Sequence, residues 1–315
     1  MKLLDTAFYF ILLPLLFILT GYCLRPDLSL EMLQYFSLWW QPILASMLTG
    51  GLLALMGSLS LASRQIFVGL ALPQGAGLSI FLYLWIVVGK TQHEEQAFLA
   101  YLAGIGGAFL TLSLFSLLKK RSSISAEGLL GLIYLVGSAG ILILGDVIGE
   151  GHHYVESLLF GNAVAVTEGE FWGVVFTASI ALIFLWPNLF KILSVLADPD
   201  FFTVAHFPVR AYRLFFYLFL CLSISLSLEI LGALATFAGL LIPAWIANQR
   251  THSSSQAFVT ALGLGLILPA LAYYYSYIFL WPAGASLVVV GMGFLLISQG
   301  IGWLFRKKTN SSFYK

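Results

Sequence analysis

Ten long runs of apolar residues, each separated from the next by a short polar segment, follow one another along the chain. Within each run the apolar residues are continuous rather than alternating with polar ones, which favours helices over strands. A helix needs about 20 apolar residues to cross a bilayer core of about 30 Å, where its backbone must satisfy its own hydrogen bonds. The pattern predicts spans at 6–24, 42–62, 66–88, 97–118, 129–147, 171–190, 214–231, 233–247, 257–278 and 285–305.

The expected fold class is therefore all-α: a polytopic integral membrane protein with about ten transmembrane helices, in a range of roughly eight to ten. The narrowest boundary lies between the seventh and eighth spans, where only Glu229 and Gly232 interrupt the run. Small residues recur inside the spans and allow helices to approach closely, so the spans are expected to pack as one bundle.

The composition fits a chain that lies mostly in lipid. Of the 315 residues, 60% are hydrophobic and 9% are charged, whereas soluble domains carry roughly 25% charged residues. The net charge of +1 leaves no basic surface for nucleic acid. Two cysteines, Cys23 and Cys221, are too few for a disulfide framework or a metal clip.

Basic residues assign the loops to two sides of the membrane, because short cytoplasmic loops collect Lys and Arg. With both termini in the cytoplasm, only Arg25 and Lys90 fall on the outer side. The other 13 of the 15 lie inside: Lys2, Arg64, Lys119, Lys120, Arg121, Lys191, Arg210, Arg213, Arg250, Arg306, Lys307, Lys308 and Lys315. We divide the chain into an N-terminal helix with its outer loop (1–41), a transmembrane domain (42–305) and a basic cytoplasmic tail (306–315).

Motifs that would carry enzyme chemistry are incomplete. The stretch 89–91 (Gly-Lys-Thr) imitates the end of a phosphate-binding loop, but Leu84 stands where the first glycine belongs. The stretch 93–95 (His-Glu-Glu) begins like a zinc-protease motif, but Ala97 occupies the position of the second histidine. We expect a transporter component that is not an enzyme and binds no cofactor itself.

Several segments in order along the chain resemble motifs of one family, the membrane-spanning permease subunits of bacterial ABC importers for zinc, manganese and iron. The segments are 64–72 (RQIFVGLAL), 126–131 (AEGLLG), 158–162 with 164–167 (LLFGN, VAVT), 198–201 (DPDF), 231–234 with 241–244 (LGAL, LIPA) and 281–285 (WPAGA). The resemblance implies a second permease copy or a paralogue, two cytoplasmic ATPase subunits that bind ATP, and an extracytoplasmic metal-binding protein. It also implies residence in the lipid of the bacterial cytoplasmic membrane, with a divalent metal as cargo.

The longest predicted cytoplasmic loop runs over residues 197–213. In it, Asp198 and Pro199 can cap a short helix, and Phe201 and Phe202 can fill a groove on a partner. The resemblance implies that the ATPase couples at these residues. Taken without the resemblance, the pattern favours an ordinary connecting loop with a proline turn.

The third span departs from the pattern of the family, in which an Asp and a His four residues apart face the cation. The matching positions here are Leu70 and Gln74, which share one helix face. An amide oxygen coordinates a transition metal only weakly and brings no charge. We expect Leu70 and Gln74 to line the translocation pathway together with Glu229, an acid at membrane depth. The alternative for Glu229 is a turn near the outer surface that water reaches.

Four residues after the fifth span, Glu150, His152, His153 and Glu156, are of types that bind metals. They are expected to catch a metal ion at the outer mouth of the pathway. The alternative is an exposed loop whose acids and histidines are simply solvated.

Four functions stay open from the sequence. The first is the permease subunit of an importer for a divalent transition metal (Zn, Mn or Fe), working by alternating access. The second is an ABC permease for a metal chelate or another small solute, because Leu70 and Gln74 replace the usual ligands. The third is a membrane scaffold that has lost its metal site. The fourth is a secondary carrier, for which Glu229 would have to serve as the coupling site.

Overall fold

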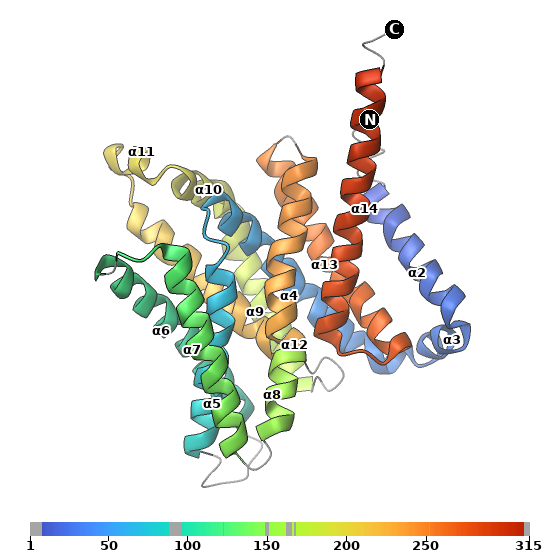
Figure 1. The fold of residues 1–315 in the computed structure, drawn as a ribbon, viewed down its shortest axis with the longest axis horizontal. Coiled ribbons are helices and arrows are strands. Elements are labelled where there is room, and N and C mark those ends of the chain that lie inside the picture. The colour runs from blue at the N-terminus through green and yellow to red at the C-terminus, as the bar shows by residue number, and fades with distance from the viewer. Residues whose placement is uncertain are drawn as a thin grey trace.

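The computed structural model describes residues 8–87, 96–121, 123–148, 151–161, 166, 168–251 and 253–311. In these residues the chain is helical, without β-strands, and its helices run back and forth as one bundle (Figure 1). Among the described residues, eight helices are long and apolar enough to cross a membrane, or nine if a bent pair near the N-terminus counts as one span. The prediction of an all-α polytopic membrane protein is confirmed.

The long helices are α4 (Phe36–Ala62), α5 (Val68–Val87), α6 (Gln96–Arg121), α7 (Ala126–Val147), α9 (Glu168–Leu185), α12 (Val209–Arg250), α13 (Ser254–Phe279) and α14 (Ala283–Ser311). The short elements are η1 (Phe8–Leu12), α2 (Leu13–Leu24), α3 (Pro26–Gln34), α8 (Gly151–Phe160), η3 (Trp186–Asn188), α10 (Leu189–Ala197) and α11 (Pro199–Val204). The bent pair joins α2 to α3 at an angle of 112°.

α12 is two helices that meet at Gly232, whose φ of 81° and ψ of 168° are not helical. Its 42 residues would measure about 63 Å as a straight helix, twice the bilayer core. The side-chain oxygens of Ser227 and Thr236 lie 2.8 Å apart, although nine residues of straight helix span about 13 Å. The chain therefore turns back at Gly232. Its two arms, 209–231 and 233–250, match two of the ten predicted spans.

Two segments predicted as outer loops are helical. α3 and α8 have 9 and 10 residues, so each measures about 15 Å and is too short to cross the bilayer. A third difference concerns the predicted span at 171–190, because the helical path continues through η3 and α10 as far as Ala197. A search for apolar runs of spanning length misses short helices of mixed polarity.

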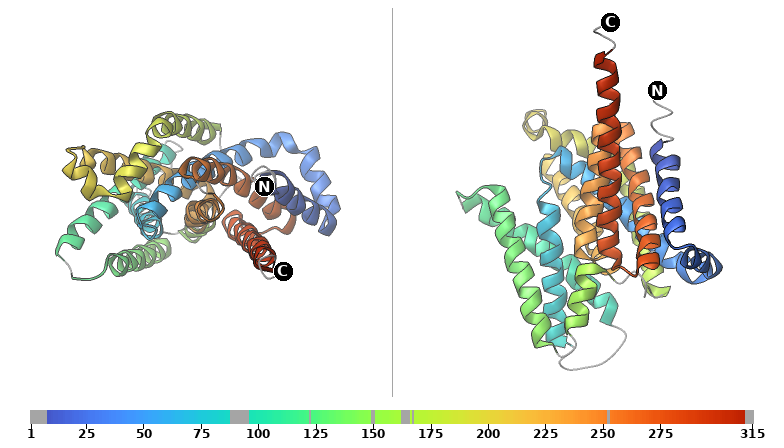
Figure 2. Two further views of the ribbon diagram at one scale, coloured as in Figure 1. Left: turned by 90° about the horizontal axis from the view of Figure 1, so that it is seen from above. Right: turned by 45° about the vertical axis from the view of Figure 1, so that its right-hand side comes forward.

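The centre of the bundle is packed through glycines. A Cβ at Gly265 of α13 would lie 2.5 Å from the Ala54 Cβ of α4, and a Cβ at Gly57 of α4 would collide with the Leu240 carbonyl of α12. Small residues of this kind let helix backbones approach closely. Seen from above, α12 and α13 lie in the middle, with α6 and α7 on one side and α2 and α3 on the other (Figure 2).

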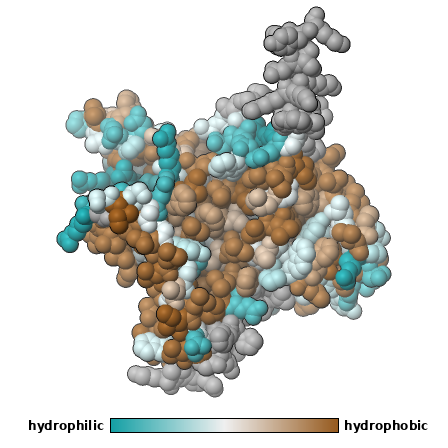
Figure 3. Space-filling view, in the orientation of Figure 1, coloured by the Kyte–Doolittle hydropathy of each residue, from teal (hydrophilic) through white to brown (hydrophobic). Residues whose placement is uncertain are grey.

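The bundle has two different ends. α11, the last turn of α6 with Lys119, Lys120 and Arg121, and the end of α12 with Arg250 lie at one end, which we call the basic end (Figure 1). The opposite end, where α14 begins, we call the outer end. On the face shown in Figure 3, hydrophobic residues cover the middle and hydrophilic residues gather toward the basic end. The positive-inside pattern predicts that the basic end is cytoplasmic.

Candidate functional site

α11 is a capped helix at the basic end. The Asp198 carboxylate accepts a hydrogen bond from the Phe201 backbone N–H at 3.1 Å, and Pro199 occupies the first helical position. The predicted cap is thereby confirmed, because both features follow from local sequence. The helix presents Phe201, with 62% of its side chain exposed, and Val204, with 80% exposed.

An aromatic series joins α11 to α12. The rings of Phe201 and Phe202 lie 5.3 Å apart, those of Phe202 and Phe207 5.6 Å apart, and those of Phe207 and Tyr212 5.4 Å apart. Phe207 lies in the segment between the two helices and Tyr212 on the first arm of α12, so a continuous set of ring contacts connects Phe201 with that arm. Phe201 and Val204 therefore form an exposed apolar surface at the basic end.

A second link ties the first arm of α12 to the turn before α5. The Tyr217 hydroxyl donates a hydrogen bond of 2.6 Å to the Gln65 amide oxygen. The neighbouring Arg64 has a φ of 57°, in the left-handed region. The start of α5, which carries Leu70, is therefore held by the same arm that α11 contacts.

Of the two α5 residues expected to line the pathway, Leu70 is half-buried and Gln74 is buried, with 6% of its surface exposed. Gln74 packs against α7, where a Cβ at Gly137 would lie 2.8 Å from the Gln74 Cβ. The Gln74 Oε1 atom has no hydrogen-bond partner. Within the described part of the chain, no group of three or more His, Cys, Asp and Glu side chains comes together as a metal site.

Glu229 lies on the first arm of α12, three residues before the break, and its side chain is exposed. Its carboxylate interacts electrostatically with the Tyr101 hydroxyl of α6. Counted from Val209, Glu229 is 20 residues along the helix, or about 30 Å, which places it near the outer end. The structure thus puts Glu229 and Gln74 on different helices.

The residues expected to catch metal are only partly covered by the structure. Glu150 lies outside the described residues, as do the side chains of His152 and His153. Glu156 is exposed on α8, which is a helix and not the loop that the sequence suggested.

One feature that sequence reasoning missed is an uncovered face on the second arm of α12, on which Leu234, Trp245 and Asn248 are exposed and Phe237 and Leu241 are half-buried. At 100° per residue these five positions fall within about 80° of one another. Leu240 on one side meets Gly69 of α5, and Ile242 on the other meets Gly291 of α14. The uncovered face therefore opens between α5 and α14, at the middle of the molecule and not at its rim.

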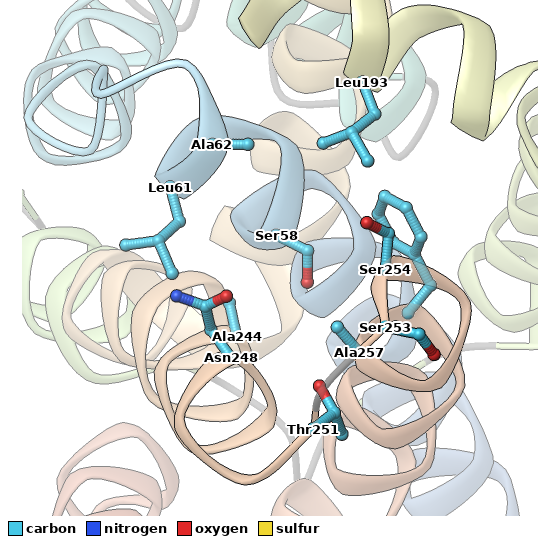
Figure 4. Close-up of a pocket in the computed structure, with 11 residues that line it drawn as sticks. Ser58, Leu61, Ala62, Leu193, Ala244, Asn248, Thr251, Ser253, Ser254 and Ala257 are labelled. Carbon is cyan, nitrogen blue, oxygen red and sulfur yellow. The ribbon is translucent and has the colours of Figure 1, made fainter.

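A polar pocket lies beside the basic end of this face. It has a volume of about 270 Å³ and is formed by α4, α10, the second arm of α12 and the start of α13 (Figure 4). Its polar lining comes from Ser58, Asn248, Thr251, Ser253 and Ser254. Asn248 belongs to both features, so the apolar uncovered face ends in a hydroxyl-lined pocket that water can enter.

A multi-pass helical bundle with a capped, exposed aromatic helix at one end and an uncovered face between its helices fits a membrane permease. Residues 35–301 match the model of the ABC 3 transport family. The chain belongs to this family.

Similar proteins cover most of the chain. The manganese transport system membrane protein MntC of Listeria monocytogenes is 25% identical over 293 residues, covering 89% of this chain and 98% of the relative. The chelated iron transport system membrane protein YfeD of Yersinia pestis is 22% identical, covering 81% and 82%. The solved structure of PsaBC from Streptococcus pneumoniae in complex with Fab has a TM-score of 0.73 at 20% identity, covering 85% and 93%.

Proposed function

We propose that this chain is the permease subunit of an ATP-driven importer that moves a divalent transition-metal ion, Zn, Mn or Fe, across the bacterial cytoplasmic membrane by alternating access. A separate ATPase supplies the energy at the basic end, and an extracytoplasmic metal-binding protein delivers the cargo to the outer end. A second copy or a paralogue completes the pathway. The observation that carries the proposal is the aromatic helix α11, exposed at the basic end and joined to α12 through ring contacts.

The proposed cargo rests on the relatives, among which MntC is named for manganese and YfeD for chelated iron. The test is uptake of radiolabelled Zn²⁺ and Mn²⁺ into proteoliposomes that hold the chain with its cognate ATPase and binding protein. We expect ATP-dependent uptake that falls with Gln74→Ala or with the pair His152→Ala and His153→Ala. Absence of uptake in a complex that hydrolyses ATP would contradict a free-ion cargo.

A second candidate, import of a metal chelate, is favoured by the residues at the centre. Leu70 and Gln74 supply no charge for a bare cation, and the uncovered face of α12 carries the rings of Phe237 and Trp245. An organic chelate neutralises the metal itself and can contact apolar and aromatic side chains.

A variant that restores the Asp and His ligands of the family distinguishes a free metal ion from a metal chelate as the cargo. In the double variant Leu70→Asp with Gln74→His, a carboxylate and an imidazole return to one helix face. If chelates are the native cargo, the double variant gains uptake of free Mn²⁺ relative to the chelated metal. A ratio unchanged from the native chain would place the cargo site elsewhere.

A scaffold that transports nothing predicts a third result. ATP hydrolysis by the complex would then be the same with and without a loaded binding protein, because no cargo step is coupled to it.

A further inference from the structure

Three backbone segments that are far apart in the sequence meet through glycines toward the outer end. A Cβ at Gly232 would lie 2.7 Å from the Phe160 carbonyl carbon, and a Cβ at Gly161 would lie 2.5 Å from the Leu231 carbonyl oxygen. A Cβ at Gly284 would lie 2.7 Å from the Phe160 carbonyl oxygen. The end of α8, the break in α12 and the start of α14 therefore touch without side chains between them. We call this contact the glycine junction.

The backbone at the glycine junction is also unusual. Gly161 has a φ of 83° and Gly232 a φ of 81°, and among the described glycines these two are the ones with positive φ. Residues with a Cβ avoid such angles, so both positions require glycine for conformation as well as for space. The two positive-φ glycines lie against each other, where the end of α8 meets the break in α12.

A pair of hydroxyls bridges the break. The Thr236 hydroxyl donates to the Gly232 carbonyl oxygen at 2.7 Å, and the oxygens of Ser227 and Thr236 are 2.8 Å apart. Both side chains are buried. A helix break leaves backbone groups without helical partners, and in an apolar interior such groups need other hydrogen bonds. The contact between the two hydroxyls joins the two arms directly beside the break, and Thr236 adds a side-chain hydrogen bond to the carbonyl oxygen of Gly232.

We propose that the glycine junction is a hinge, about which the two arms of α12 change their angle together with α8 and α14 during the transport cycle. This inference rests on the proposed function, since alternating access requires an element with two arrangements. Hinges are a few residues that absorb a change in φ and ψ between rigid elements. Contacts made by backbone alone can pivot, whereas interlocked side chains in a core resist such movement. The first arm is connected to α11 by the ring contacts, and the second arm carries the uncovered face.

The first test locks the hinge reversibly. Ser227→Cys and Thr236→Cys are introduced together in a chain in which Cys23 and Cys221 are replaced by alanine. The oxygens lie 2.8 Å apart, so sulfurs there are within reach of a disulfide after a small adjustment. We expect uptake to fall at least tenfold on oxidation and to return on reduction, with the bond verified by mass spectrometry. The single-cysteine variants should not respond. Full uptake by the oxidised protein would overturn the hinge and leave the proposed function intact.

The second test needs no transport. Spin labels at Leu218 on the first arm and at Trp245 on the second arm, both exposed, report the angle in complexes that contain one labelled copy. Each position is about 20 Å from Gly232, so a change of about 20° moves the labels by about 7 Å. We expect such a shift between nucleotide-free and ATP-bound complexes. An unchanged distance in a complex that hydrolyses ATP would overturn the hinge. This measurement tests the hinge even if no tested cargo is imported. In that case the proposed function fails and the hinge does not.

Discussion

α12 is held in two different ways at its two ends. At the basic end it is contacted by side chains, the rings of Phe207 and Tyr212 and the Tyr217 hydroxyl. At the glycine junction it is contacted by backbone, with Gly161 and Gly284 against Leu231 and Gly232. Side-chain contacts can be lost one at a time, each at a limited cost. Backbone contacts tolerate no added atom, so any side chain there disturbs three segments together.

This difference predicts that substitutions at the two ends of α12 affect different properties, the stability of the chain at one end and the binding of a partner at the other. A substitution at the glycine junction should destabilise the chain itself. A substitution of an exposed aromatic residue at the basic end should leave the chain folded and weaken a partner's binding.

The largest effect is expected for Gly232→Ala. The new Cβ would be forced into a positive φ and against Gly161 and Phe160, at a cost of about 3 kcal/mol or more. Thermal unfolding of the purified chain in detergent measures this loss. The matched control is Gly173→Ala in α9, where a Cβ meets nothing within 4 Å. The control should be as stable as the native chain or gain about 0.5–1 kcal/mol from helix propensity. Equal melting temperatures for the two variants would remove the contrast between the ends of α12.

The location of the break was predictable, but its geometry was not. Glu229 and Gly232 interrupt an apolar run, which is enough to separate two spans. Gly232 has a positive φ and lies against Gly161, which is 71 positions earlier in the chain. No local pattern encodes that contact. In the same way α3 and α8 were expected as loops, because neither has the length or the continuous apolarity of a span.

The second effect concerns Phe201→Ala. Phe201 is 62% exposed, so the free energy of unfolding of the variant should lie within about 0.5 kcal/mol of the native value. An anchoring aromatic residue in an interface contributes about 2 kcal/mol to binding, or roughly 30-fold in affinity. When the ATPase concentration is limiting, ATP-driven uptake should therefore fall at least tenfold. Leu280→Ala is the control, since that residue is 86% exposed and lies at the outer end, between α13 and α14. Loss of uptake in both variants would argue against a specific coupling surface.

The part of the candidate site that depends only on adjacent residues was predictable. Asp198 followed by Pro199 indicates the start of a helix, because capping depends on a few adjacent residues. The uncovered face of α12 was not predictable, since most of the second arm is apolar and its neighbours decide which face stays open. The burial of Gln74 likewise depends on Gly137 of α7, which allows the two helices to approach.

The third effect is expected for Tyr217→Phe. Removing the hydroxyl leaves the Gln65 amide oxygen without its 2.6 Å hydrogen bond, at a cost of about 1 kcal/mol. The loss should appear as a lower melting temperature, together with a smaller fraction of ATP turnover coupled to uptake, because α5 is then less firmly tied to the first arm. Tyr212→Phe is the comparison, since it keeps the ring that stacks on Phe207. If both variants behave alike, the hydroxyl of Tyr217 has no special part in holding α5.

The smallest effect is expected for Asp198→Ala. The carboxylate caps α11 by accepting from the Phe201 N–H, and loss of a cap costs about 0.5–1 kcal/mol on an exposed helix. Because α11 has only 6 residues, this cost is a large part of its own stability and a small part of that of the chain. The melting temperature should hardly change, while the ATPase concentration needed for half-maximal uptake should rise about 2- to 5-fold. Asp198→Asn separates capping from charge, since asparagine caps as well as aspartate does. Native coupling in Asp198→Asn assigns the effect to the cap, whereas an equal loss in both variants would assign it to the carboxylate charge at the interface.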